Sequence, residues 1–356
     1  MQIMRMCDAF AQNGHQVTLV SGGYGDVRRT ERDTYRYYGV PRSFSMFSVS
    51  RTPGPGRVYI WAMRAALRAR LAGANLVYGR SVLPCYYSAR LGLPTVWEVH
   101  EPIIDMRRRK LARVRRLLAD PRLVRLVALS QALGERYRAE FSIAKDRVLV
   151  AYNGADDVPD VKPLSLPPGG DSFLVGYAGS LYRGKGVELI VQIAPHCPWA
   201  TFFVAGGDEA EVNRWRARTI DISNIHFLGH LSQEELAGFR SAVDAVLVPP
   251  NRRVIVNRGA EIDQALAPPL KLFEALACGK PVVCSDHLEE VVTDDVNAIL
   301  CNPEDPQQWE VALQRLAYDA ALRQKLVSGA RTLFENGLSW RARAKLVLSG
   351  LDAPAE

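Results

Sequence analysis

The sequence lacks the features that would place the protein in a membrane or outside the cell. None of its 356 residues lies in an apolar run long enough to span a bilayer. The N-terminus has no charged region followed by a continuous apolar core, which a secretory signal requires. The six cysteines lie far apart and form no C-x-x-C pair, so we expect reduced core thiols and neither a disulfide framework nor a zinc site. The sequence therefore predicts a cytoplasmic protein.

Motifs of other function classes are also missing. No G-x-G-x-x-G follows an opening strand, which argues against a nicotinamide-dependent dehydrogenase. No D-x-D motif lies near the candidate sites described below, so we expect neither a metal nor a cofactor. There are no internal repeats, and the length suggests two ordinary globular domains.

Positive charge is concentrated in one segment of a chain whose formal net charge is +7. This basic segment runs from Arg107 to Arg116, and Leu111, Val114 and Leu117 recur in and after it at helical spacing. The pattern predicts a basic amphipathic helix. Such a helix is either a solvated face or a peripheral contact with the inner face of an anionic membrane. No nucleic-acid-binding motif accompanies the charge, so we do not expect nucleic acid as a partner.

Short apolar runs alternate with helical patterns in both halves, which predicts an α/β fold of parallel sheets covered by helices. We predict an N-terminal domain over residues 1–152, a Pro/Gly-rich linker over 153–171, a C-terminal domain over 172–337 and a closing helix within 338–356. The predicted strands are 16–21, 76–78, 95–99, 126–130, 148–151, 173–178, 201–205, 225–228, 245–248 and 281–284. The predicted helices are 58–72, 131–140, 187–194, 209–219, 233–242, 270–277 and 306–319.

The opening of the chain departs from the usual order of a doubly wound domain. Such a domain begins with a strand, a glycine-rich turn and a helix. This chain begins with a helical pattern over residues 3–12, followed by Gly14 and a strand. We therefore expect the first strand and its turn to be missing, because of a start assigned too late or a shortened chain. A genuinely reduced domain is the alternative.

The most informative segment is residues 268–283, which predicts a loop, a helix and a strand. Pro269 suits the start of the helix, and Gly279 suits a left-handed C-cap. Free N–H groups near Leu270 and Lys271 would form an anion site suited to a diphosphate. Glu274 lies one turn further, where a carboxylate accepts hydrogen bonds from ribose hydroxyls. The alternative is an ordinary capped helix with a surface glutamate.

Residues 269–283 resemble the donor-site segment of glycosyltransferase family 4. The resemblance extends over most of the chain, and the motifs keep the family's order and spacing. The other similar segments are 14–20, 152–156, 175–180, 185–186 and 225–229. The resemblance implies the GT-B fold, in which two Rossmann-like doubly wound domains face a cleft. It also implies a C-terminal helix that crosses back to the N-terminal, acceptor-side domain.

The resemblance assigns roles to residues of the donor domain. Glu274 would bind the donor ribose, and the backbone of Pro269, Leu270 and Lys271 would contact the diphosphate. We place Lys185 on the donor phosphates as a cation that stabilises the leaving group, with an ordinary surface lysine as the alternative. The remaining donor-binding candidates are Gly179, Ser180 and Arg183 at the start of the domain and Leu228 near the nucleotide base.

The acceptor-side candidates follow a predicted strand. His100 ends the apolar run 95–99, so it is expected at the carboxyl edge of a sheet, which faces the ligand crevice. It resembles the family's histidine that contacts the transferred sugar, and with Lys185 and Glu274 it makes up the predicted catalytic set. Glu101 is either an acceptor-side base or a helix cap.

Two positions depart from the family pattern. Leu266 stands where the family usually has a second glutamate, and Ser180 stands where many relatives have an arginine. The sequence predicts a metal-independent, retaining hexosyltransferase that moves a sugar from a nucleoside-diphosphate donor to a hydroxyl acceptor. We expect the acceptor to be a glycan, a lipid-linked glycan or a polysaccharide. The alternatives are a degenerate protein that only binds nucleotide-sugar and a nucleotide-sugar epimerase on the same fold.

Overall fold

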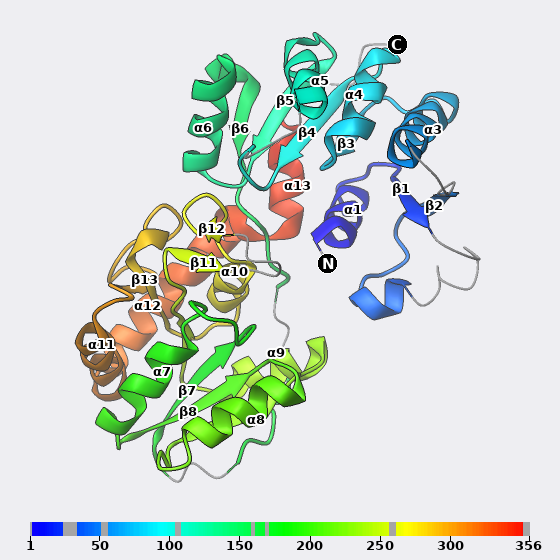
Figure 1. Cartoon of the computed structure of the whole chain (residues 1–356). Coiled ribbons are helices and arrows are strands. Elements are labelled where there is room, and N and C mark those ends of the chain that lie inside the picture. The colour runs from blue at the N-terminus through cyan, green and yellow to red at the C-terminus, as the bar shows by residue number, and fades with distance from the viewer. Residues whose placement is uncertain are drawn as a thin grey trace. The chain divides into compact units, whose positions relative to one another are not determined.

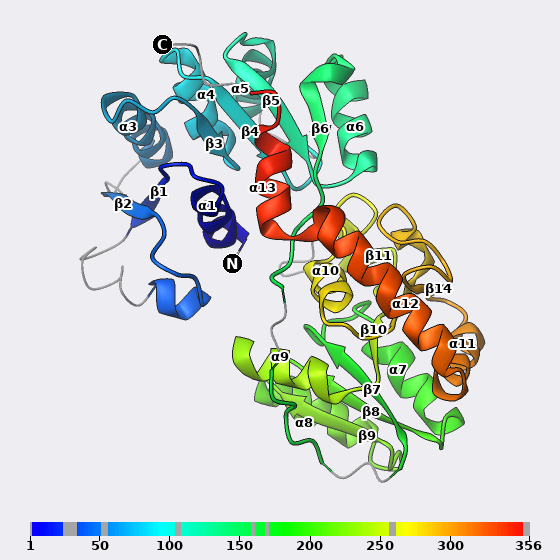
Figure 2. The same ribbon diagram turned by 180° about the vertical axis from the view of Figure 1, so that it is seen from behind.

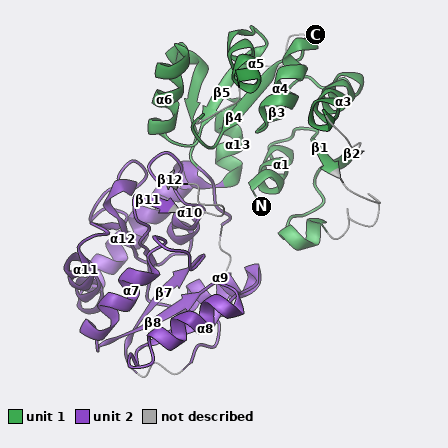
Figure 3. Cartoon of the chain, in the orientation of Figure 1, with its two compact units in different colours: residues 1–152, 340–356 green, residues 153–339 purple. Residues whose placement is uncertain are grey.

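The structure is a computed structural model. It describes residues 2–23, 34–50, 56–103, 108–157, 161–167, 171–255 and 261–351 (Figure 1). Arg107 and the linker residues 158–160 and 168–170 lie outside the described residues. The chain divides into two compact units, Met1–Tyr152 with Trp340–Glu356, and Asn153–Ser339 (Figure 3). Both units are Rossmann-like, which confirms the predicted fold class.

The first unit contains two parallel sheets. Its strands are β1 (Thr18–Gly23), β2 (Ser45–Ser50), β3 (Val77–Gly79), β4 (Thr95–Val99), β5 (Leu123–Ala128) and β6 (Val148–Val150). Strands β3 to β6 form one sheet in that order, and β1 pairs with β2 in the other. No described strand joins β1 to β3.

Helices from both ends of the first unit's sequence pack together. Its helices are α1 (Gln2–Gln12), α3 (Arg57–Leu71), α4 (Val82–Arg90), α5 (Arg108–Ala119), α6 (Gln131–Phe141) and α13 (Trp340–Leu348). Helix α13, the predicted closing helix, lies beside α1 in both views (Figure 2). The side chains of β4 are buried along its whole length. The C-terminal helix is therefore part of the unit whose core β4 forms.

The second unit is built on one six-stranded parallel sheet. Its strands are β7 (Phe173–Ala178), β8 (Ala200–Ala205), β9 (Ile225–Gly229), β10 (Ala245–Val248), β13 (Val282–Ser285) and β14 (Ile299–Cys301). They follow the order β14-β13-β10-β7-β8-β9. The strand order therefore reverses between β7 and β10. Ligands of doubly wound domains bind outside the carboxyl ends of the strands at such a switch point.

The remaining elements of the second unit connect and cover this sheet. They are the helices α7 (Val187–Ile193), α8 (Glu209–Arg218), α9 (Gln233–Ala242), α10 (Leu270–Ala277), α11 (Pro306–Tyr318) and α12 (Ala320–Leu333), and the antiparallel pair β11 (Arg253–Ile255) and β12 (Glu261–Asp263). Complete capping boxes start two helices: Asp208 with Glu211 at α8, and Ser232 with Glu235 at α9.

Several predicted bounds differ from the structure. Strand β5 begins at Leu123, three residues before the predicted 126–130, because Leu123 and Arg125 already pair with Thr95 and Val96 of β4. The predicted strand also ended too late. Ser130 is the N-cap of α6, and its hydroxyl accepts from the Leu133 amide at 3.0 Å. The elements β2, α4, β11, β12, β14 and α12 were not predicted.

All six cysteines are free, and five of them are buried, as expected for reduced core residues. The described part of the chain contains no helix long and apolar enough to cross a membrane. Nor do its described residues gather three His, Cys, Asp or Glu side chains into a group that could hold a metal ion.

Candidate functional site

Glycine brings the strand ends of the second unit's sheet close together at the switch point. Gly179 follows β7, and its amide donates to Ala205 at the end of β8 at 2.9 Å. Gly206, the next residue along, has a φ of 130°, and a Cβ there would lie 1.8 Å from the carbonyl oxygen of Gly179. Only glycine fits this position. The loops after β7 and β8 are therefore held against each other at the carboxyl edge.

Helix α10 points its N-terminus into a pocket at this edge. The helix begins at Leu270, and its N-cap Pro269 offers no side-chain cap to the first turn. Gly279 beyond its other end has a φ of 69°, the left-handed conformation that the sequence predicts. The pocket has a volume of about 290 Å³. Its lining residues are Tyr177, Ser180, Lys185, Gln264, Ala267, Pro269, Leu270 and Lys271.

The pocket brings together five of the predicted donor-binding residues: Ser180, Lys185, Pro269, Leu270 and Lys271. Four candidates are not among its lining residues, and the first of them, Gly179, directly precedes Ser180 after β7. The Arg183 side chain is exposed, Leu228 lies on β9 two strands away from β7, and Glu274 lies one turn further along α10. Tyr177 and Gln264 line the pocket but were not identified from the sequence, because a tyrosine in an apolar strand and a loop glutamine carry no motif.

Two lysines give the pocket its charge. The Nζ of Lys271 donates to the carbonyl oxygen of Lys185 at 3.2 Å and lies 4.4 Å from the centre of the Tyr177 ring. Burial, reinforced by the positive charge of Lys185, lowers the pKa of Lys271 to about 7. Burial also lowers the pKa of Lys185. The two cations therefore repel each other in a half-buried space, an arrangement that an anion between them would relieve.

Tyr177 holds the loop of this site in place. Its hydroxyl donates to the carbonyl oxygen of Ser180 at 2.8 Å and lies 3.2 Å from that of Lys185. Burial raises the pKa of this hydroxyl, so it stays protonated and keeps donating. The loop that carries Ser180 and Lys185 is thus anchored to a fully buried side chain of β7.

Glu274 forms an ion pair with Arg240 of α9. The Arg240 side chain is 10% exposed and that of Glu274 is 27% exposed, so the pair lies near the surface with one face open to a ligand. A carboxylate fixed by a guanidinium on one side retains lone pairs for hydroxyl donors on the other. The sequence did not identify Arg240, because it lies 34 positions before Glu274.

The acceptor-side candidates lie in the first unit. His100 follows β4, and its Nε2 is hydrogen-bonded to Oε1 of Glu98. Burial lowers the pKa of His100, and the cations Arg80 and Arg343 act in the same direction, whereas Glu98 opposes them. The Glu101 side chain is exposed, and its carbonyl oxygen accepts from the Tyr137 hydroxyl at 3.2 Å. The next described helix, α5, starts only at Arg108.

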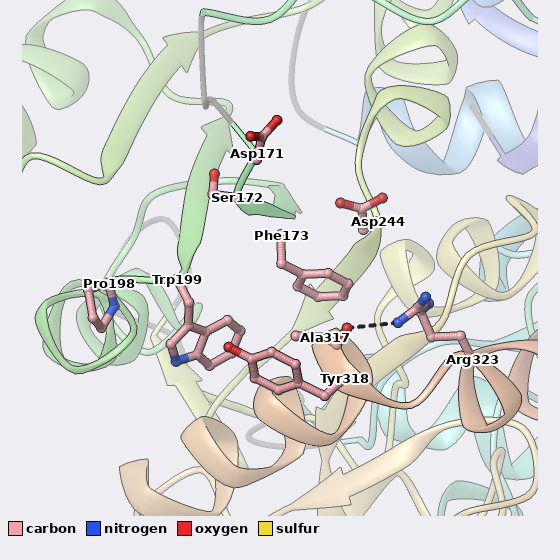
Figure 4. A pocket seen from close by; sticks show the side chains of 9 residues that line it. All are labelled: Asp171, Ser172, Phe173, Pro198, Trp199, Asp244, Ala317, Tyr318 and Arg323. Carbon is pink, nitrogen blue, oxygen red and sulfur yellow. Dashed lines mark hydrogen bonds between the residues drawn. The ribbon is translucent and has the colours of Figure 1, made fainter.

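A larger hollow lies at the opposite, amino edge of the second unit's sheet, and Figure 4 shows its lining side chains. It has a volume of about 620 Å³. Two of its polar side chains are hydrogen-bonded to the backbone: Asp244 accepts from the Leu174 amide at 2.8 Å, and Arg323 donates to the carbonyl oxygen of Ala317 at 3.0 Å. Because ligands of such sheets bind at the carboxyl edge, we place the site at the smaller pocket.

The basic segment forms α5 as predicted, apart from Arg107, which is not described. Val114, Leu117 and Leu118 are buried, and Arg108, Arg109 and Lys110 are exposed at its start. The Arg113 guanidinium lies 4.5 Å from the centre of the Tyr59 ring on α3. Helix α3 in turn exposes the large apolar side chains Val58, Tyr59, Ile60, Leu67 and Leu71.

Comparison with known families matches both halves of the chain. Residues 1–158 match the model of Glycosyltransferase Family 4. Residues 172–319 match the model of Glycosyl transferases group 1. The first match contains His100, and the second contains the lysine pocket.

Curated relatives and solved structures agree with these matches. A D-inositol 3-phosphate glycosyltransferase of Stackebrandtia nassauensis is 27% identical over 228 residues, which are 56% of this chain and 47% of the relative. An uncharacterized glycosyltransferase of Methanocaldococcus jannaschii is 24% identical over 62% of this chain and 57% of its own. The chain thus matches about half the length of these relatives.

Among solved structures, Anabaena HepE in complex with UDP has a TM-score of 0.72 and 17% identity, covering 98% of this chain and 95% of its own. Sucrose-phosphate synthase from Thermosynechococcus elongatus has a TM-score of 0.67 and 18% identity, covering 96% of this chain and 90% of its own. At these identities the likeness establishes a shared fold.

Proposed function

This chain belongs to glycosyltransferase family 4, and we propose that it transfers a sugar from a nucleoside-diphosphate donor to a hydroxyl acceptor with retention of configuration. The observation that carries the proposal is the pocket at the N-terminus of α10, where Lys185 and Lys271 converge at a topological switch point. A helix N-terminus flanked by two cations suits a diphosphate.

The donor diphosphate would lie against the first turn of α10. As the bond to the sugar breaks, negative charge builds on the leaving nucleoside diphosphate, and fixed cations stabilise it without reorganisation. Lys185 and Lys271 would perform this role without a metal ion. Glu274, oriented by Arg240, would accept hydrogen bonds from the ribose hydroxyls. Gly179, which has no side chain, would allow the donor diphosphate to approach the end of β7.

The sugar and acceptor would contact residues of the first unit. His100 would orient the transferred sugar, and the Glu101 carboxylate would accept a hydrogen bond from the acceptor hydroxyl. No carboxylate occupies the position of Leu266, so we infer that the acceptor attacks from the same face that the diphosphate leaves. The departing phosphate then takes the hydroxyl proton, which balances the step without a covalent enzyme intermediate.

Uridine is the base to test first, because HepE has been solved with UDP and with UDP-glucose. The experiment is calorimetric titration of the protein with UDP, GDP and ADP and with their glucose conjugates. We expect one base to bind, and we expect binding to weaken in Lys185→Ala and Glu274→Ala but not in Lys325→Ala, an exposed position on α12. No binding of any nucleoside diphosphate would refute the proposed function.

A degenerate protein that binds nucleotide-sugar without transfer is the second candidate, and Leu266 favours it. Binding by calorimetry together with no release of nucleoside diphosphate in the presence of any hydroxyl acceptor would support this candidate. Release of nucleoside diphosphate that stops in Lys185→Ala would support the transferase.

We propose a lipid-linked acceptor at an anionic membrane surface, because α5 and α3 combine exposed cations with exposed apolar side chains. Basic side chains attract anionic lipids, and apolar ones insert at the headgroup boundary. The test is co-sedimentation with vesicles of phosphatidylcholine with and without phosphatidylglycerol. We expect binding only to the anionic vesicles, and loss of that binding when Arg108, Arg109 and Lys110 are all changed to Glu. Equal binding by this variant would exclude α5 as the contact.

A further inference from the structure

A buried ionic cluster in the first unit joins His100 to the C-terminal helix. Glu98 on β4 is 0% exposed, and Arg343 on α13 is 1% exposed. The Arg343 Nη1 donates to Oε2 of Glu98 at 3.2 Å. Glu98 Oε1 accepts from Nε2 of Gln2 at 2.7 Å and is also bonded to the His100 ring. Residues from β4, α1 and α13 thus meet at one carboxylate.

Arg343 is held in this place by more than Glu98. Its Nε donates to the carbonyl oxygen of Tyr152 at 2.6 Å, and its Nη2 to that of Ala151 at 3.2 Å. Its Nη1 also lies 3.3 Å from the Tyr78 hydroxyl. A guanidinium whose three nitrogens all donate hydrogen bonds cannot turn away from the carboxylate. The ion pair is therefore a fixed part of the core and not a mobile surface pair.

The charge of Glu98 is determined by its neighbours. Burial is the largest single influence and would raise the pKa of this carboxyl, but Arg343 and His100 together outweigh it and lower the pKa. Glu98 is therefore ionised and can only accept hydrogen bonds. Whatever atom faces it must carry a hydrogen, and this includes Nε2 of His100.

We propose that Glu98 and Arg343 are positioning residues that hold neutral His100 as the Nε2–H tautomer, which leaves its Nδ1 lone pair to accept a hydrogen bond from a hydroxyl of the sugar substrate. Among the described residues, Glu98 is the only hydrogen-bond partner of the His100 ring. The ring is 20% exposed, so a ligand can approach it. The substrate part of this inference rests on the proposed function, whereas the tautomer does not.

The tautomer can be measured without donor or acceptor, by NMR of the whole protein labelled with ¹⁵N-histidine. The His100 signals are identified by their absence in His100→Gln. In the wild type we expect a protonated Nε2 and an unprotonated Nδ1. A protonated Nδ1 in the neutral ring would overturn the proposal.

Glu98→Gln tests the role of the carboxylate. Arg343 can only donate, so the new amide must turn its oxygen toward Arg343 and its NH₂ toward His100 and Gln2, and Gln2 can flip its own amide to accept. The ring nitrogen Nε2 must then accept, which switches the tautomer to Nδ1–H. Loss of the negative charge also lowers the pKa of His100, by about one pH unit or more for a charge in direct contact. An unchanged tautomer and pKa would show that Glu98 is only structural.

Arg343→Met tests the second residue and shifts the His100 pKa in the opposite direction. It removes a cation that opposes protonation of His100 and leaves Glu98 with Gln2 and the His100 ring as its partners, so the pKa of His100 rises. Arg343→Lys keeps the charge and is expected to stay near the wild type. Because Arg343→Met can fail to fold, Arg343→Met with Glu98→Gln provides a neutral buried pair that is expected to fold.

Thr95→Val is the matched control. Thr95 is a fully buried polar residue of the same strand, whose hydroxyl donates only to the carbonyl oxygen of Leu93, at 2.9 Å. This variant disturbs packing without changing charge, so both the tautomer and the pKa should stay as in the wild type. Shifts of the same sign in Thr95→Val, Glu98→Gln and Arg343→Met would indicate general loosening and refute the proposal.

Activity separates this inference from the proposed function. If the wild type transfers sugar, kcat/KM should fall at low pH as His100 becomes protonated, and Arg343→Met should move that fall to higher pH. If the tautomer is as proposed but no donor binds, the proposed function fails while the assignment of Glu98 and Arg343 holds.

Discussion

Lys271 makes donor binding depend on pH in a way that can be calculated. Its pKa of about 7 means that Lys271 is protonated in about half of the free protein molecules at pH 7. A diphosphate in contact with the side chain favours the charged form. Binding therefore takes up about half a proton at pH 7 and about 0.9 of a proton at pH 8. Affinity should fall about tenfold from pH 6 to pH 8, or about 1.4 kcal/mol.

The assay is calorimetric titration at pH 8 with a nucleotide-sugar, in two buffers that differ in ionisation enthalpy. A nucleotide-sugar is preferred to a free diphosphate because its phosphates do not titrate near neutral pH. The difference in measured heat gives the number of protons taken up on binding. We expect Lys271→Arg to bind without proton uptake, since arginine is always charged. Lys271→Met should bind weakly at every pH, and Lys325→Met should behave as the wild type.

Two outcomes would refute this reasoning. Uptake below about 0.2 of a proton by the wild type at pH 8 would mean that Lys271 is already charged in the free protein. Uptake that persists in Lys271→Arg but disappears in Lys185→Arg would assign the proton to Lys185, whose pKa is also lowered by burial.

Three further predictions concern stability and the site. Gly186→Ala should lower the melting temperature and weaken donor binding, because Gly186 has a φ of 101° and a Cβ there would lie 2.2 Å from the carbonyl oxygen of Pro249. Glu274→Ala should destabilise the protein by about 1–3 kcal/mol in urea unfolding, because it leaves Arg240 partly buried without its partner. A loss of stability below about 0.3 kcal/mol would mean that solvent replaces the carboxylate. Glu98 has a lowered pKa in the folded state, so its contribution to stability is present above the unfolded pKa of about 4.3 and is lost as pH falls further. Acid unfolding followed by circular dichroism should therefore show a shallower pH dependence in Glu98→Gln than in the wild type.

The sequence predicted the elements whose side chains follow a strong local pattern. The observed bounds of β7, β10 and α10 are the predicted ones, because a short apolar run between turn residues and a helix between Pro269 and Gly279 are local signals. Helix α4 was missed because Pro84 and two tyrosines interrupt its pattern, although a proline is tolerated in a first turn. Strand β14 has only three residues, too few for a periodicity.

In the candidate site, too, the sequence predicted local features but not the contacts between distant residues. The sequence nominated Lys185, Lys271 and His100 individually, because a cation beside a helix start and a histidine at a strand end are local features. It did not predict what controls their charge. The pKa of Lys271 is lowered by burial and by Lys185, 86 positions away, and the pKa of Glu98, the partner of His100, is lowered by Arg343, 245 positions away. Such pairs exist only after the chain has folded.

Two arginines of α13 look alike in the sequence but lie in different surroundings. Arg341 and Arg343 lie two positions apart on α13, yet Arg341 is exposed and donates to Asn13 while Arg343 lies in the core. Two residues along a helix turn a side chain by about 200°, which here separates solvent from the buried carboxylate. Arg341→Met should therefore leave the tautomer and the pKa of His100 unchanged, whereas Arg343→Met should raise that pKa. Equal effects of the two variants would mean that the net charge of α13 matters and the buried contact does not.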